Sequence, residues 1–131
     1  DVIALLGETK DDLAASEYAQ SLLGLTTDEL VENGALPELD LELEKRVQET
    51  CLKLADALLL KSAHDCSEGG LAVALAESCI ADRNQPLGAS VDLAPWASLP
   101  LRALFFGEAQ SRIVVSTPKP DAVLAIAKEH G

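Results

Sequence analysis

The densest group of chemically capable side chains lies between residues 62 and 77. His64 and Asp65 are followed by Ser67, an acid and the glycine pair Gly69–Gly70, after which the chain becomes apolar. His and Asp side chains supply general acid–base chemistry, and a helix that begins after glycines offers unpaired N–H donors to an anion. The same residues also suit a strand-to-helix junction without a ligand, so both interpretations stay open.

Structural roles are the preferred interpretation for two of these residue types. Adjacent residues of a strand point to opposite faces, so His64 and Asp65 are not expected to pair directly while the strand persists. No Gly-x-Ser-x-Gly pattern marks Ser67 as a nucleophile, and we predict that it is the N-cap of the following helix. Gly69 and Gly70 lack a Cβ, which lets a second backbone or a phosphate come close.

A second polar cluster stands just before an apolar strand. It consists of Glu108, Gln110, Ser111 and Arg112. A carboxylate, an amide, a hydroxyl and a guanidinium can together hold a phosphate, a ribose or a glycinamide group. The alternative, which we slightly prefer, is that Glu108 and Arg112 tie down the turn or dock onto a neighbouring domain.

The elements that would position these clusters alternate between apolar strands and helices. Strands are expected at residues 2–6, 62–66, 87–93 and 113–115. Helices are expected at residues 16–23, 41–61, 70–81, 101–106 and from about 118 onward. This alternation predicts an α/β fold, a sheet packed with helices. At least one strand pair should be antiparallel, because residues 87–115 contain no long crossover helix.

Local signals set several boundaries of these elements. Ser16 and Asp40 are predicted N-caps, and Asn33-Gly34 and Pro37 are predicted breakers in the least determined region. The helix at residues 70–81 is apolar on nearly all sides, so we expect it to be almost wholly buried.

Composition limits the classes of function. The chain has 131 residues and a formal net charge of −12, which argues against nucleic-acid or anionic-membrane partners. Cys51, Cys66 and Cys79 form no metal-ligand pattern, and free thiols in a reducing cytosol are the simpler interpretation. No apolar run approaches the roughly 20 residues that span a bilayer. We expect a single domain, 1–131, excised from a longer chain, because it opens directly on a strand without Met.

Three segments, in order, resemble the phosphoribosylformylglycinamidine synthase family of ATP-dependent amidation enzymes. Residues 62–77 are similar to its pattern His-Asp-x-Ser-(Asp/Glu)-Gly-Gly-Leu-Ala-Val-Ala-Leu-Ala-Glu. Residues 6–18 resemble its opening strand, loop and first helix, and residues 105–116 resemble its Phe-Gly-Glu-x-Gln-Ser-Arg strand entry. The departures are Cys66, Glu68 and the pair Ala14–Ala15, where relatives often have two glycines.

The resemblance implies a C-terminal domain of the aminoimidazole ribonucleotide synthetase-like fold, with a mixed sheet. In the family an N-terminal and a C-terminal domain form a pair that occurs twice in tandem, and the match is most like the second copy. The resemblance further implies a ligase of purine biosynthesis in the cytoplasm, with ATP and Mg²⁺ in the parent enzyme and neither bound by this fragment alone. Its implied partners are the N-terminal ATP-binding domain of the same polypeptide and a glutaminase domain or subunit.

The family's metal-binding acids and catalytic His lie on N-terminal domains, so no catalytic or metal residue is expected here. The candidates for ligand binding or domain docking are His64, Asp65, Ser67, Gly69, Gly70, Glu108, Gln110, Ser111 and Arg112. Two alternatives stay open: another superfamily member such as aminoimidazole ribonucleotide synthetase, and a non-enzymatic acidic α/β interaction module.

Overall fold

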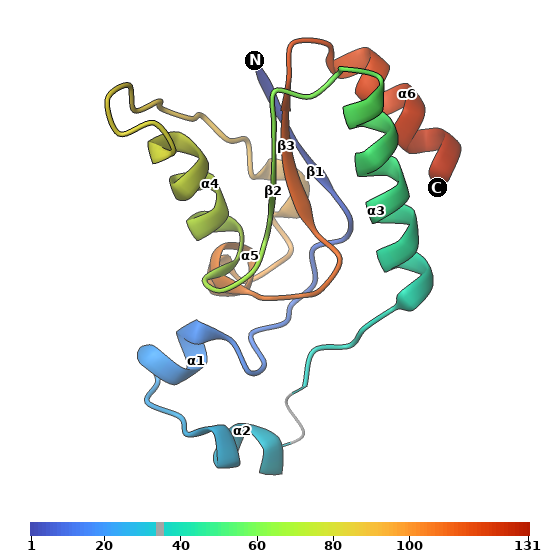
Figure 1. Ribbon diagram of the computed structural model, residues 1–131. Coiled ribbons are helices and arrows are strands. Elements are labelled where there is room, and N and C mark those ends of the chain that lie inside the picture. The colour runs from blue at the N-terminus through green and yellow to red at the C-terminus, as the bar shows by residue number, and fades with distance from the viewer. Residues whose placement is uncertain (34–35) are drawn as a thin grey trace.

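The computed structural model describes residues 1–33 and 36–131 (Figure 1). The strands are β1 (Val2–Leu6), β2 (Ser62–Asp65) and β3 (Ile113–Thr117). The helices are α1 (Glu17–Ser21), α2 (Thr27–Glu32), α3 (Leu41–Asp56), α4 (Gly70–Ile80), the 3-10 turn η1 (Ala94–Trp96), α5 (Leu101–Phe106) and α6 (Pro120–His130). Gly34 of the predicted Asn33-Gly34 breaker lies outside the described residues.

The three strands form one sheet in the order β1-β3-β2. β3 pairs antiparallel with both neighbours, with Ala4 opposite Val115 in one register and Ala63 opposite Val115 in the other. The expected α/β class and the expected antiparallel pairing are confirmed. Among the described residues both pairings are antiparallel, which corrects the expectation of a mixed sheet.

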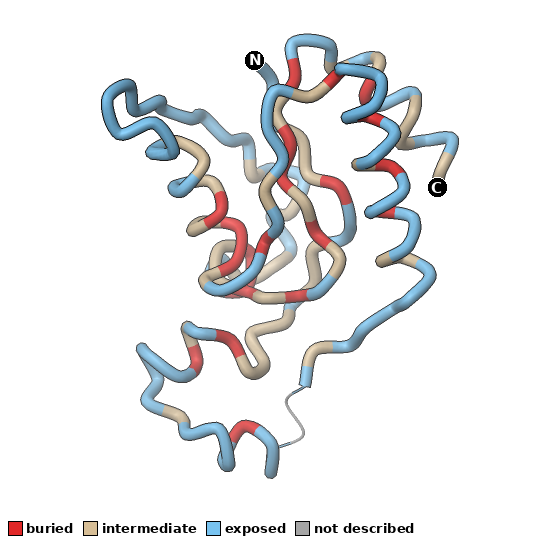
Figure 2. Tube along the Cα trace, viewed as in Figure 1, coloured by how far each residue is buried: buried red, intermediate tan, exposed pale blue. Residues whose placement is uncertain are grey.

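Residues 87–93 do not form the expected strand. Residues 81–92 are all exposed, and the segment ends where the Asp92 carboxylate accepts the N–H of Ala94 at 2.9 Å (Figure 2). Of the alternating apolar residues, Leu87 and Val91 remain 71% and 41% exposed, so the segment buries too little apolar surface to hold a strand on the sheet. The predicted strand at residues 87–93 is therefore wrong, since a loose period-two pattern alone does not stabilise a strand.

Helices cover both faces of the sheet, as Figure 1 shows. On one face α3 and α6 pack through Val47, Leu54 and Val123 against Val115. On the other face α4 and α5 pack through Leu71 and Leu104 against Val114. Val114 and Val115 are neighbours on β3 and point to opposite faces, so one central strand carries both cores.

The helix starts follow the predicted capping chemistry. Ser16 Oγ accepts the N–H of Ala19, and the Asp40 carboxylate accepts the N–H groups of Glu42 and Leu43, as expected of N-caps. α3 ends at Asp56 rather than at residue 61, because Leu58 adopts a left-handed backbone with φ of 55°. Nothing in the side chains of residues 57–61 signals that stop.

α4 is less buried than its composition predicts. Only Gly70, Leu71 and Ala74 are fully buried, and Ile80 is 57% exposed. The helix covers the sheet with one side only, and the exposed segment after it does not cover the other side. Within the described residues no helix is long and apolar enough to cross a membrane.

Candidate functional site

The glycine pair forms the turn that starts α4. Gly69 and Gly70 have φ of 80° and 65°, a left-handed backbone that favours glycine. Gly69 is the N-cap of α4, and no side chain caps this helix start. The expectation that Ser67 is the N-cap is therefore wrong: the Ser67 hydroxyl donates to the Asp65 carboxylate.

The glycines bring two backbones together at this turn. A Cβ on Gly70 would lie 2.5 Å from the carbonyl oxygen of Gly107 and 2.9 Å from that of Phe105. A Cβ on Gly107 would lie 2.6 Å from the carbonyl oxygen of Asp12. We expected the glycine pair to admit either a second backbone or a phosphate. In the structure, the backbone of residues 105–107 lies close to Gly70.

Glu108 satisfies the donors that the turn leaves open. Its Oε1 accepts the N–H of Gly69 and the N–H of Glu17, both at 2.8 Å. One carboxylate thus joins the starts of α4 and α1, where the partial positive charge of each helix favours it. The expected structural role of Glu108 in tying down the turn is present.

Arg112 is buried beneath the same turn, with 3% of its surface exposed. Its Nε donates to the Ala109 carbonyl at 3.0 Å and its Nη2 to the Gly107 carbonyl at 2.5 Å. Burial lowers the pKa of the guanidinium from its ordinary value, with opposing contributions from Cys66, Asp12 and Glu108. Arg112 therefore holds its own loop in shape.

Gln110 and Ser111 complete the second cluster. Gln110 is exposed and donates to the Glu108 carbonyl at 3.3 Å. Ser111 has φ of 63°, and its backbone packs closely against Gly7. Among the described atoms neither Ser111 Oγ nor Arg112 Nη1 has a hydrogen-bond partner, and both are buried.

His64 finds its main partner on α4. Its Nε2 lies 3.1 Å from Glu77 Oε2, and its Nδ1 lies 2.7 Å from the Asp65 carbonyl oxygen. The Asp65 carboxylate is 3.9 Å from Nδ1 and hydrogen-bonds to Ser67 instead. That hydroxyl, with the Asp65 backbone, holds the pKa of the Asp65 carboxyl below its ordinary value. Glu77 could not be found from local spacing, because only the packing of α4 beside β2 brings it to His64.

Part of both clusters lines one hollow of about 450 Å³ at the carboxyl end of β2. Its ionisable side chains are Glu44, Asp65, Glu68, Glu108 and Arg112, together with the Cys66 thiol. Burial raises the pKa of that thiol, so it is no ready nucleophile. Glu44 comes from α3 and was not among the predicted site residues.

The charges of this hollow disfavour an anionic ligand. Four carboxylates face it, and two donors of its one cation, Arg112, already bind the loop's own carbonyls. A phosphate in this hollow would be repelled by the four carboxylates. Within residues 1–33 and 36–131 no group of three or more His, Cys, Asp or Glu is placed to hold a metal ion. We call this arrangement of hydrogen bonds, which links the loop of residues 107–112 to the starts of α1 and α4, the joint.

A family model described as "AIR synthase related protein, C-terminal domain" matches residues 1–131. The chain belongs to this family. A curated relative, phosphoribosylformylglycinamidine synthase subunit PurL of Caldanaerobacter subterraneus, is 46% identical over 132 aligned positions, which cover 99% of this chain. The PurL subunit of Anaeromyxobacter dehalogenans is 48% identical over 129 positions, covering 93% of this chain. In each case the match spans 16% of the relative's length.

Solved structures share the fold. The PurL of Thermotoga maritima complexed with FGAR superposes with a TM-score of 0.69 at 24% identity, covering 98% of this chain and 21% of that chain. The same protein complexed with ATP gives a TM-score of 0.59 at 22% identity, with 98% and 19% covered. These likenesses establish the α/β arrangement of sheet and helices for this chain.

Proposed function

We propose that this chain is the C-terminal domain of a phosphoribosylformylglycinamidine synthase. That ligase uses ATP to convert formylglycinamide ribonucleotide and glutamine-derived ammonia to formylglycinamidine ribonucleotide. The observation that carries the proposal is identity of 46% over nearly the whole chain to a PurL subunit. Because the relatives reported above bear that name, they favour this ligase over aminoimidazole ribonucleotide synthetase and over a non-enzymatic module.

In this proposal the domain is auxiliary and the chemistry takes place elsewhere in the polypeptide. The helix-start donors that would suit a phosphate are occupied by Glu108, and the hollow beside them carries mostly negative charge. In the cytoplasm, ATP and Mg²⁺ would bind to the N-terminal ATP-binding domain of the longer polypeptide. Ammonia would come from a glutaminase domain or subunit. The resemblance of the sequence motifs to the second tandem copy motivates this distribution of roles.

In this proposal the joint around Glu108 has a structural role. It fixes the starts of α1 and α4 and the end of α5 relative to one another, through one carboxylate and two close backbone contacts. A rigid surface of this kind can position a neighbouring domain without touching substrate. Gln110, which is exposed beside the joint, is available for such a contact.

Genetic complementation tests the proposal directly. The gene encoding the whole polypeptide should restore growth without added purine to a bacterial strain that lacks this synthase. A control gene with residues 1–131 deleted should not restore growth. Failure of the whole gene, when the protein is shown to accumulate, would contradict the proposed function.

A substitution tests the auxiliary role separately. Gln110→Ala in the whole polypeptide should leave kcat/KM for formylglycinamide ribonucleotide within about threefold, because in this proposal Gln110 touches neither substrate nor nucleotide. A loss of a hundredfold or more at unchanged thermal stability would show that this cluster touches substrate.

A further inference from the structure

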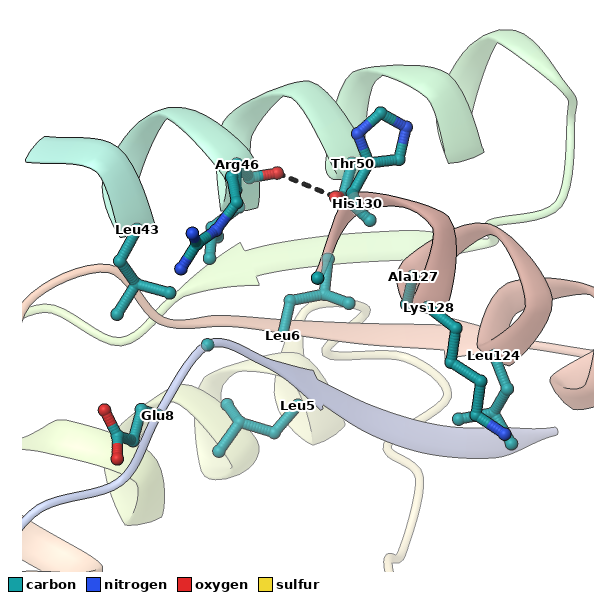
Figure 3. Close-up of a pocket in the computed structure, with 13 residues that line it drawn as sticks. Leu5, Leu6, Glu8, Leu43, Arg46, Thr50, Leu124, Ala127, Lys128 and His130 are labelled. Carbon is teal, nitrogen blue, oxygen red and sulfur yellow. Dashed lines mark hydrogen bonds between the residues drawn. The ribbon is translucent and has the colours of Figure 1, made fainter.

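A groove of about 460 Å³ lies between α3 and α6, beside the end of β1. Its walls are largely apolar, with Leu5 from β1, Leu43 and Val47 from α3, and Leu124 from α6. Figure 3 shows these elements surrounding the opening. The groove is separate from the acidic hollow described above, with which it shares no lining residue.

Basic side chains border this groove although the chain as a whole is strongly acidic. They are Arg46 from α3 and Lys128 and His130 from α6. Within the part of the chain that the structure describes, none of the three forms an ion pair, and His130 Nε2 is buried without a hydrogen-bond partner. The one acidic side chain in the lining, Glu8, lies 3.8 Å from Lys10 instead. Asp40 interacts with Arg46 only at longer range than an ion pair, so Arg46 and Lys128 give the groove positive charge in a chain of net charge −12.

The placement of the cations selects the shape of the occupant. The side chains of Arg46 and Lys128 extend toward different ends of the groove, with Leu5 and Leu6 between them (Figure 3). A compact anion such as phosphate would leave the apolar wall of the groove uncovered. An extended segment with an aliphatic side chain over the apolar wall and a carboxylate toward each end satisfies both cations and covers Leu124, which is 51% exposed.

We propose that this groove binds an acidic, leucine-type segment from another part of the same polypeptide. The inference rests on the proposed function, in which this chain is one domain of a longer protein, as it spans 16% of the length of its relatives. A tethered segment is present at high effective concentration and needs no electrostatic steering, whereas a free anion approaches against the field of an acidic chain.

Zero-length cross-linking of the whole polypeptide tests the proposal. A carbodiimide joins an amine to a contacting carboxylate as an amide, and the water removed converts the carbodiimide to a urea. Mass spectrometry of the digest should show Lys128 Nζ joined to an Asp or Glu outside residues 1–131. Lys53 is the control amine: it is an exposed α3 residue outside the groove, and it should not join that peptide.

Matched variants separate the groove from general surface charge. Arg46→Glu keeps the Lys128 amine but reverses the charge at the other end, and it should lower the cross-link yield at least fivefold. Lys53→Glu, also on exposed α3, should leave the yield unchanged. Equal yields in both variants would overturn the proposal.

Three other outcomes would overturn it as well. They are an unlinked Lys128 that is fully acylated by an amine reagent, a link between differently isotope-labelled copies, and protection of Lys128 that requires added inorganic phosphate. The same preparation is assayed for formylglycinamidine ribonucleotide, so an active enzyme without the cross-link rejects the groove proposal and retains the proposed function.

Discussion

At the scale of single residues, the site is organised by glycines, which lack a side chain, and by one carboxylate that accepts the N–H groups an anionic ligand would otherwise bind. Gly70 and Gly107 allow backbones to approach, and Glu108 then accepts the N–H groups left open by that approach. The sequence marks these residue types as candidates. It does not show that Glu108 would reach Glu17, 91 positions away, because that contact depends on tertiary packing.

Gly70→Ala should be among the most destabilising small substitutions. The new Cβ adds the cost of a left-handed backbone, about 1–2 kcal/mol, to a clash with a carbonyl that costs a further 1–3 kcal/mol or so. Gly24→Ala is the matched control: its φ is 70°, and no described atom lies within 4 Å of the added Cβ. Urea unfolding should show the larger loss at Gly70, and equal losses would mean that only the backbone angle matters.

Glu108→Ala should cost about 1–3 kcal/mol of unfolding free energy, because the N–H groups of Gly69 and Glu17 lose their acceptor. Glu108→Gln keeps an oxygen acceptor and should cost less. Thermal denaturation compares the two variants. A Gln variant as unstable as the Ala variant would show that the negative charge, rather than the acceptor, is what these helix starts need.

The hydrogen bond from the Ser67 hydroxyl to the Asp65 carboxylate should make the free energy of unfolding depend on pH. It is the main cause of the lowered pKa of Asp65, so its stabilising effect is complete above the unfolded pKa of about 4 and is lost as pH falls through the folded value. Ser67→Ala should raise the Asp65 pKa in an NMR titration and destabilise the fold at pH 7 but not near pH 2. Ser98→Ala, at an exposed position, serves as the control. An unchanged Asp65 pKa would contradict the assignment.

At the scale of elements, continuous apolar runs and strong caps could be predicted, and weak periodicities could not. β1, β3 and α5 lie close to where the sequence places them, because each is a short, mostly apolar run with clear polar or glycine boundaries. β2 is polar, and its position was predicted from the glycine turn that follows it. The segment 87–93 and the end of α3 differ from expectation. The first has too little apolar surface for a strand, and the second stops at Leu58 without a breaking residue.

The partial burial of α4 changes which of its leucines should matter. Leu71 is 4% exposed and packs with Leu104 and Val114, so Leu71→Ala should cost about 2–5 kcal/mol. Leu75 is only partly buried, so Leu75→Ala should cost clearly less than the 2–5 kcal/mol or so that a wholly buried helix would imply. Chemical denaturation of both variants measures the difference. Equal costs would show that residues 81–92 cover α4 in solution.

At the scale of the whole molecule, the domain has two hollows of different charge. The acidic hollow contains the hydrogen bonds around Glu108. The basic groove is bordered by Arg46 and Lys128, which form no ion pair within the described residues. Motifs spread over most of the chain were enough to predict the family, which the match over residues 1–131 confirms. The geometry of the hollow could not be predicted, since it is formed by residues from β2, α3 and the loop before β3.

The central claim is that this chain contributes to an ATP-dependent ligase without carrying the reaction itself. The most direct measurement is a steady-state assay with formylglycinamide ribonucleotide, ATP, Mg²⁺ and ammonia, run on purified residues 1–131 and on the whole polypeptide. The account predicts formylglycinamidine ribonucleotide from the whole polypeptide and no turnover above background from residues 1–131. Turnover by residues 1–131 alone, or none by the whole polypeptide, would contradict it.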